Sequence, residues 1–554
     1  MDAIDVRKLD LLSNSLADFL RLDPSVDLQE RGPDGTQADV SIRGGTFEQT
    51  LVLLNGFRMN DAQTGHHDMD LPLPLDAVSA VEILPGSGST LYGSDAMGGV
   101  VNFITQAPKA TELRVRTAFG NFGVNQQSAS LTTVFQKATE QVAFSRDFST
   151  GFMPDRDYRN LEFFSNTHLT SRLGPTDVVL AYNDRPFGAN DFYGNYESWE
   201  RTGTRFGSFR QAVGSDNEIS FAFRRHTDIF VLLRDDPQFY TNHHVLDSYQ
   251  AAFRRRQRLK ENTRLFYGVE GYQDSIASNN LGDHTRGRVA GYLDLDVRAW
   301  KRLSFSLGAR EEFYKSVRGQ FVPAFDAGYW INSELKLRGH VSRSFRVPSM
   351  TELYYHDPTT VGSPDLLPES AWSAEGGLDW KPDSRITGEL TAFDRWEHNV
   401  IDYARPSSTD VWRATNIQRL HFQGVEAAVK TKVKQSQDVD LRCTVMRGFR
   451  DQLGDLQTLY VFNYPVYSGV ASWQASIPHG LVARSRLGVL KRYGRDPYGL
   501  WDLWLARDAG CIHPFLQLTN LTNTSYQEIA GVPMPGRAIV AGVELVLFRG
   551  RSTQ

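Results

Sequence analysis

The chain of 554 residues carries 60 basic and 65 acidic residues, which gives a net charge of −5. This balance argues against the strongly basic surface that nucleic-acid binding requires, so no nucleic acid is expected as a partner. Mean hydropathy is −0.39, and no apolar run approaches the roughly 18 residues of a membrane-spanning helix. The two cysteines, Cys443 and Cys511, provide neither a disulfide framework nor the spacing of a metal site.

The first hundred or so residues read as a mixed α/β segment. Ser13 to Leu22 predicts a short helix, because serines that can cap it precede an apolar face. Leu51 to Leu54 is a continuous apolar run, which is typical of a strand buried on both faces. The dipeptide Asn55-Gly56 that follows predicts a tight turn.

After Pro108 the pattern changes to strict alternation. Ile219, Phe221 and Phe223 alternate with polar residues, and so do many later segments. Alternation predicts strands with one apolar and one polar face. A soluble sandwich would turn the apolar face inward, whereas a membrane barrel would turn it toward lipid. Alternation alone leaves both open.

Four sequence blocks resemble the plug domain of TonB-dependent outer-membrane receptors. They occur in that family's order and spacing, and they are Ser41 to Gly44, Leu51 to Gly56, Val81 to Gly86 and Tyr92 to Asn102. Ser344 to Glu369 and Asn520 to Arg537 resemble two barrel segments of the same family.

The resemblance implies a transmembrane β-barrel of about 22 antiparallel strands with an N-terminal α/β plug domain in its lumen. We expect the plug at residues 1–108, the barrel at 109–548 and a tail at 549–554. The expected location is the outer membrane of a Gram-negative cell, as a multi-pass barrel and a monomer. We find neither a signal peptide nor the family's TonB-binding segment before the plug, so we expect the chain to begin part-way into that domain.

The resemblance also assigns residues to the plug motif. Arg43 is expected to pair with glutamates on the inner barrel wall and to act in gating or as a structural ion pair. The remaining plug-motif residues are Gly44, Asn55, Gly56, Gly86, Gly93, Gly98, Gly99 and Asn102.

Ligand contacts are expected at the plug apex and in barrel loops. The resemblance places them at Asp61, Gln63, Thr64, His66, His67, Asp68, Tyr354, Tyr355 and His356. His243 and His244 form a further pair in an expected loop. Imidazole can ligate haem iron, but ordinary loop histidines and binding of another metal chelate stay open. No cofactor and no resident metal are expected.

No catalytic constellation is found, so we expect a receptor and not an enzyme. The resemblance implies active uptake of a scarce, bulky ligand, driven by the TonB–ExbB–ExbD inner-membrane complex. A ferric siderophore or similar iron complex is favoured over haem or cobalamin. A truncated receptor that binds without being energised stays open as well, and a passive porin is less favoured.

Overall fold

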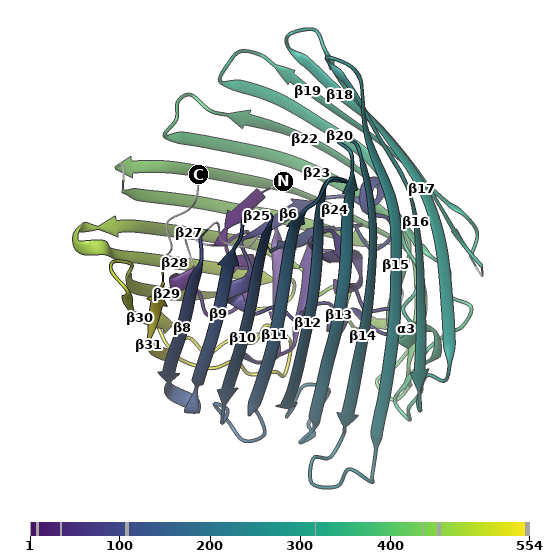
Figure 1. Cartoon of the computed structure of the whole chain (residues 1–554). Coiled ribbons are helices and arrows are strands. Elements are labelled where there is room, and N and C mark those ends of the chain that lie inside the picture. The colour runs from purple at the N-terminus through teal and green to yellow at the C-terminus, as the bar shows by residue number, and fades with distance from the viewer. Residues whose placement is uncertain are drawn as a thin grey trace.

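The computed structural model describes residues 2–6, 10–33, 36–105, 110–315, 317–434, 436–450 and 456–548. Figure 1 shows a wide ring of long strands that encloses a smaller N-terminal domain. None of the helices in the described ranges is long and apolar enough to cross a membrane.

The ring is a closed antiparallel barrel. Leaving aside two-residue pairings in its connections, it comprises 22 strands within the described residues: β8 (Glu112–Gly120), β9 (Asn125–Val134), β10 (Ala138–Ser149), β11 (Tyr158–Thr170), β12 (Pro175–Gly188), β13 (Trp199–Val213), β14 (Asn217–Val231), β15 (Thr241–Lys260), β16 (Thr263–Ser278), β17 (His284–Ala299), β18 (Leu303–Tyr314), β19 (Gln320–Trp330), β20 (Leu335–Arg346), β22 (Glu369–Trp380), β23 (Ile386–Arg405), β24 (Trp412–Lys434), β25 (Gln437–Arg450), β27 (Pro465–Ile477), β28 (Leu481–Arg492), β29 (Tyr498–Arg507), β30 (Ile512–Thr519) and β31 (Ala538–Leu547). β31 pairs with β8 and closes the ring. The strand number expected from the resemblance is confirmed.

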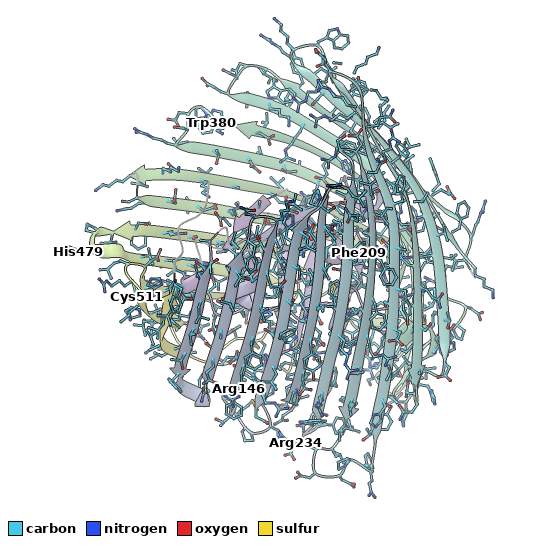
Figure 2. All side chains as sticks on the ribbon, in the orientation of Figure 1. Arg146, Phe209, Arg234, Trp380, His479 and Cys511 are labelled. Atoms are coloured by element: carbon cyan, nitrogen blue, oxygen red, sulfur yellow. The ribbon has the colours of Figure 1, made fainter. Side chains whose placement is uncertain are left out.

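The barrel wall has the inverted polarity of a membrane barrel. On β14, Ile219 and Phe221 are about half exposed on the outside, whereas Ser220 and Arg224 are buried on the lumen side. Phe209 on the neighbouring β13 also lies on the outer surface (Figure 2). The choice that alternation left open is therefore settled in favour of apolar side chains facing lipid.

The two ends of the barrel differ in their connections. At one end the turns are short, as at residues 214–216, 261–262 and 300–302. At the other end the connections are longer and reach their maximum at residues 347–368, which contain α3 (Met350–Tyr354) and β21 (Thr360–Val361). β26 (Gln457–Thr458) also lies in a connection at that end. Because outer-membrane barrels have short inner turns and longer outer loops, we call these the inner end and the outer end.

The N-terminal domain, the plug, is mixed α/β and lies inside the barrel. Its strands are β1 (Asp2–Asp5), β2 (Val26–Glu30), β3 (Ala38–Ile42), β4 (Thr50–Leu54), β5 (Phe57–Arg58), β6 (Ala80–Pro85) and β7 (Gly99–Ile104). Its helical segments are η2 (Asp10–Leu12), α1 (Leu16–Leu20), η4 (Phe47–Gln49), η5 (Gly65–His67), η6 (Leu75–Ala77) and α2 (Ser89–Tyr92). The main sheet has the order β1-β6-β7-β4-β5, and β2 pairs with β3. As predicted, β4 is buried throughout, and the turn at Asn55 and Gly56 has positive φ at both residues.

The first helix is shorter than the predicted span from Ser13 to Leu22. Ser15 is the N-cap of α1. The carbonyl of Ser13 accepts hydrogen bonds from Arg116 and Gln517 of the barrel wall, so it does not take part in the first turn of the helix. After Leu20 the chain continues as turns, in which the amides of Leu22 and Asp23 donate to the carbonyls of Phe19 and Leu20. Pro24 then disfavours helical backbone at Asp23.

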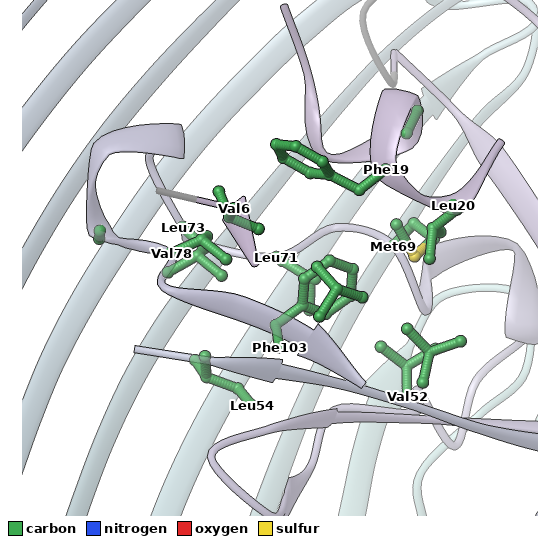
Figure 3. Close-up of a cluster of buried hydrophobic side chains, with 14 of the residues drawn as sticks. Val6, Phe19, Leu20, Val52, Leu54, Met69, Leu71, Leu73, Val78 and Phe103 are labelled. Carbon is green, nitrogen blue, oxygen red and sulfur yellow. The ribbon is translucent and has the colours of Figure 1, made fainter. Parts of the chain in front are cut away.

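The plug core is apolar and continuous with one arc of the barrel. Val52, Leu54 and Phe103 from the central strands pack with Phe19 of α1 (Figure 3). The same cluster includes inward-facing barrel residues, among them Ala143, Phe164, Phe206 and Phe515. These come from β10, β11, β13 and β30, so the plug packs by apolar contact against this arc. The expected boundary at residue 108 and the tail at 549–554 lie outside the described residues.

Candidate functional site

Arg43 joins the plug to the barrel wall opposite β22 and β24. Its Nε and Nη2 donate to the two carboxylate oxygens of Glu426 at 2.8 and 2.6 Å, and its Nη1 lies 2.8 Å from Glu375 Oε1. The guanidinium also lies over the ring of Phe393 at 4.5 Å. Burial lowers the pKa of Arg43, but the two glutamates more than offset this effect and raise it. We call Arg43, Glu375 and Glu426 the Arg43 clamp.

The plug glycines allow the close approach that the Arg43 clamp requires. Gly86 has φ +87°, and a Cβ atom there would overlap Glu375 Oε1 and lie 2.8 Å from Arg43 Nη1. Four other predicted glycines also have close neighbours: Gly44 meets Phe422, Gly93 meets Arg310 and Glu312, Gly98 meets the backbone of Ile42, and Gly99 meets that of Leu84.

The turn at Asn55 and Gly56 is fixed to β7. Asn102 Oδ1 accepts from the Gly56 amide at 3.0 Å, and Asn102 Nδ2 donates to Glu82 at 2.9 Å. This part of the predicted motif therefore holds the plug sheet together and does not face the Arg43 clamp.

A cavity of about 700 Å³ lies between the plug and the wall next to the Arg43 clamp. Arg43, Glu375 and Glu426 line it, together with residues from the inner ends of β17 to β25. The volume lies within the range of typical small-molecule sites. This arc of the barrel thus leaves a large space beside the plug, whereas the cavity between the plug and β8 to β12 on the apolar arc measures about 120 Å³.

The predicted apex residues of the plug lie under α3 at the outer end. The amides of Met350 and Thr351 donate to the carbonyls of Ala62 and Gln63 at 2.8 and 3.0 Å. Hydrogen bonds therefore couple the plug loop directly to the longest outer connection.

Most of these apex side chains are buried. Asp61, Gln63, Thr64, His67 and Asp68 have at most 8% of their surface exposed. His66 is partly exposed, stacks on Phe47 at 4.2 Å and has Nδ1 2.8 Å from Asp39. Burial lowers the pKa of His66, so its imidazole is neutral near pH 7.

The three predicted barrel residues follow α3. Tyr354 stacks on His284 at a ring distance of 3.6 Å, and Tyr355 donates from its hydroxyl to Asp357 at 2.9 Å. The His356 side chain is exposed, and its backbone carbonyl accepts from Asn280. The structure therefore brings Tyr354 and Tyr355 close to the plug loop through α3, whereas His356 points to the outside.

The histidines predicted to lie in a loop belong to a strand. His243 and His244 are near the start of β15, because a cross-strand ladder with Ile229 and Asp228 of β14 fixes them there. The prediction of a loop for this pair is wrong. His243 is exposed, and His244 points into the lumen.

A buried polar cluster at the outer side of the plug escaped the sequence reasoning. His67, Asp70 and His226 have ligating atoms within 4.8 Å of one another, and so do His67, Glu200 and Asp228. Either set could hold a metal ion. Burial lowers the pKa of His67, but Asp228 and Asp70 more than offset this effect and raise it well above the usual value. The alternation through Ile219 and Phe221, extended by a few residues, would have placed Arg224, His226 and Asp228 on one lumen face.

A second buried arginine network was also missed. Arg346 makes bidentate contacts with both Glu352 of α3 and Glu369 of β22, at 2.7 to 2.8 Å. Gln49 of the plug donates to Glu369 at 2.9 Å. This network ties α3 to the wall and to the plug, and the sequence block from Ser344 to Glu369 contains its three charged members.

Comparison with known proteins agrees with this architecture. Residues 2–100 match the TonB-dependent Receptor Plug Domain, and residues 111–526 match the family TonB dependent receptor-like, beta-barrel. The chain is 25% identical over 448 residues to the vitamin B12 transporter BtuB of Photobacterium profundum, covering 75% of this chain and 70% of that relative. It is 24% identical over 464 residues to an iron-regulated outer membrane virulence protein of Vibrio cholerae, covering 73% and 68%.

Solved structures share the fold at low sequence identity. The siderophore receptor PirA from Acinetobacter baumannii has a TM-score of 0.80 at 14% identity, covering 99% of this chain and 98% of that chain. The FrpB iron transporter from Neisseria meningitidis also has a TM-score of 0.80 at 14% identity, covering 99% and 100%. At this identity the likeness establishes the fold alone.

Proposed function

Because this chain belongs to the family of TonB-dependent receptors of the outer membrane, we propose that it takes up a scarce, bulky iron complex by active transport. The preferred ligand class is a ferric siderophore. The energy would come from the TonB–ExbB–ExbD inner-membrane complex, which would act on the plug. No bond is made or broken in the ligand, so the protein acts as a gated receptor.

The Arg43 clamp is the observation that carries the proposal. A guanidinium held by two carboxylates fixes the plug firmly, yet ion pairs can exchange their partners for water once they separate. The cavity of about 700 Å³ lies beside the clamp and gives the plug somewhere to move. A purely structural ion pair is the alternative function of the same contacts, and the cavity beside them favours gating.

The outer end supports ligand sensing through α3. Tyr354, Tyr355, His356 and His66 offer aromatic and imidazole groups that are at least partly exposed. Asp61, Gln63, Thr64, His67 and Asp68 are buried, so they would respond to a ligand indirectly. The backbone hydrogen bonds from α3 to the plug loop provide that link.

The ligand identity is the finer part of the proposal. The named relatives include both a vitamin B12 transporter and an iron-regulated protein, so cobalamin is the second candidate. Haem is a third candidate, because imidazoles of His66 and His356 lie at the outer end and can ligate haem iron.

Uptake measurements test the proposal. Cells that lack other receptors would be given labelled ferric siderophores, haemin or cobalamin, with and without a protonophore. We expect saturable uptake of an iron complex that the protonophore abolishes. Uptake that persists unchanged after the protonophore would indicate a passive porin and refute active transport.

A spectral titration separates the haem candidate from the rest. Haemin would be added to the purified unmutated protein and to the variants His66→Ala and His356→Ala. A Soret shift that either variant removes would favour haem as the ligand. An unchanged spectrum with the unmutated protein would exclude it.

A further inference from the structure

Three buried side chains at the seam between plug and barrel bring ligating atoms together. Asp70 Oδ2 lies 3.4 Å from His67 Nδ1 and 3.4 Å from His226 Nε2. The three residues, which we call the His67 triad, are 4%, 4% and 0% exposed. His67 and Asp70 belong to the plug, and His226 belongs to β14.

The spacing of the His67 triad suits a metal ion better than direct hydrogen bonds. Good hydrogen bonds to nitrogen span about 2.7–3.2 Å, so both 3.4 Å separations are long. A tetrahedral zinc ion with bonds of about 2.0–2.1 Å holds its ligand atoms about 3.3–3.4 Å apart. The two measured separations match edges of such a polyhedron.

Each member of the His67 triad has a charged partner behind it. Arg185 Nη1 lies 2.9 Å from Asp70 Oδ1, which leaves Oδ2 directed at the imidazoles. His67 Nε2 faces Asp228 Oδ2 at 3.4 Å, which is also longer than a good hydrogen bond. Ligating histidines in metalloproteins use such carboxylates to fix the ring orientation and the tautomer.

His226 has the closest of these partners. Its Nδ1 lies 2.8 Å from Asp61 Oδ2, but the angle falls outside that of a normal hydrogen bond. A small rotation of the ring toward an ion at Nε2 would align this pair. The second nitrogen of each imidazole thus faces a carboxylate.

Carboxyl groups outnumber guanidinium groups around the His67 triad. The surrounding buried groups are four carboxyl groups and two guanidinium groups: Asp61, Asp70, Glu200, Asp228, Arg185 and Arg224. A buried charge must be compensated, so this surplus of carboxyl groups suits a cation. That cation can be a proton on an imidazole, and a metal ion would take its place.

Polar atoms near the His67 triad lack hydrogen-bond partners within the described part of the chain. They are Asp228 Oδ1, Gln63 Oε1 and His244 Nδ1, all on side chains at most 5% exposed. Such a concentration of unpaired buried atoms in one place is unusual for a native structure and requires an explanation. A bound cation with its water would pair acceptors of this kind.

We propose that His67 Nδ1, Asp70 Oδ2 and His226 Nε2 bind one divalent transition-metal ion of the zinc class. Two imidazoles and one carboxylate are ligands that zinc accepts, and water would complete the coordination. The ion would join the plug to β14 near the outer end. This site is independent of the transported ligand.

Metal titration and X-ray absorption test the site. The purified protein, with any histidine tag removed, would be stripped with a chelator and titrated with zinc against a chromophoric competitor. We expect one tight equivalent per chain, with two imidazoles and bonds of about 2.0–2.2 Å at the zinc edge. Asp70→Asn and His226→Gln should each abolish the tight equivalent.

Two further variants test whether the loss of zinc binding is specific to the three ligands. Asp61→Asn should weaken zinc binding about 10- to 100-fold, because Asp61 faces His226 from behind and is not itself a ligand. His66→Gln is the matched control and should bind zinc like the unmutated protein, since His66 stacks on Phe47 outside the triad.

The proposal fails if the unmutated protein holds no tight zinc. It also fails if Asp70→Asn and His226→Gln bind as the unmutated protein does, or if the absorption spectrum shows no imidazole ligand. Folding of each variant would be checked by its electrophoretic mobility before and after heating. Where a variant does not fold, the spectrum of the unmutated protein decides.

Discussion

Removing the arginine of the Arg43 clamp should loosen the plug by a large and calculable amount. Arg43→Met keeps an unbranched side chain over Phe393 but leaves Glu375 and Glu426 facing each other without a counter-ion. Breaking one partner of a buried ion pair costs about 3–5 kcal/mol. At about 1.4 kcal/mol per factor of ten, plug opening should become two to nearly four orders of magnitude more frequent.

Hydrogen exchange followed by mass spectrometry measures this opening directly. Peptides covering β3 and β4 should lose protection in Arg43→Met, while peptides from β10 and β11 should not change. The triple variant Arg43→Met, Glu375→Gln, Glu426→Gln should recover most of the protection, because it leaves no buried charge without a partner.

A matched arginine separates charge from packing. Arg484 of β28 is also buried and stacks over Trp504. It donates to the carbonyl of Leu12 and the hydroxyl of Ser13 in the plug. Within the described ranges, no carboxylate oxygen forms an ion pair with it within 4.0 Å. Arg484→Met should therefore cost only about 1–2 kcal/mol. Equal loss of protection in the two variants, or no recovery in the triple variant, would refute the clamp as the main electrostatic anchor.

Three further changes probe other parts of the molecule. Gly86→Ala should lower local stability in hydrogen exchange by about 1–3 kcal/mol more than Gly531→Ala does in its own outer connection. The φ angles are similar, +87° and +82°, but only Gly86 faces the Arg43 clamp. Burial raises the pKa of Glu48 from 4.5 to about 8. Between these two pH values the folded plug holds a proton that the unfolded plug releases. The free energy of unfolding should therefore fall by up to about 1.4 kcal/mol per pH unit from about pH 4.5 to 8. Glu48→Gln should flatten that slope in thermal unfolding, and an unchanged slope would contradict the assignment. Leu180→Arg, on the lipid face of β12, should lower the free energy of unfolding by about 2–4 kcal/mol in denaturant titrations in lipid. The control Leu173→Arg, in the inner turn, should lower it by only about 0–1 kcal/mol.

The strands of the barrel were predictable because each one repeats the same local rule, whereas their closure into a membrane barrel was expected only from the family resemblance. Residues such as Phe221 and Ser220 alternate in sequence as they do across the wall, so the pattern needs no knowledge of neighbours. The first helix was predicted too long because tertiary contacts overrode local propensity. Barrel side chains occupy the carbonyl of Ser13, and Pro24 limits the other end.

The site was predictable only where its members are close in sequence. The resemblance pointed to Arg43 and to the apex loop, but Glu426 lies 383 residues from Arg43, and the register of the barrel decides which strand faces it. The same holds for His226, whose partners Asp61 and Asp70 come from the plug. His243 and His244 looked like loop residues because the polar stretch before them resembles a turn, yet the ladder with β14 extends through them.

The two arcs of the barrel hold the plug by different forces, and this difference favours movement on one side. Against β8 to β14 and β29 to β31 the plug buries apolar side chains, in addition to the ion pairs of Arg185 and Arg224. Exposing the apolar surface to water would cost about 25 cal/mol per Å². Against β22 and β24 it is held by the Arg43 clamp and by the hydrogen bond from Gln49 to Glu369, and the separated polar groups can regain much of their interaction energy from water. The cavity lies on the clamp side, so water already has space there. A force on the plug would therefore separate the charged side first and leave the apolar side as the hinge, which is why the clamp, and not the core, should govern the opening rate.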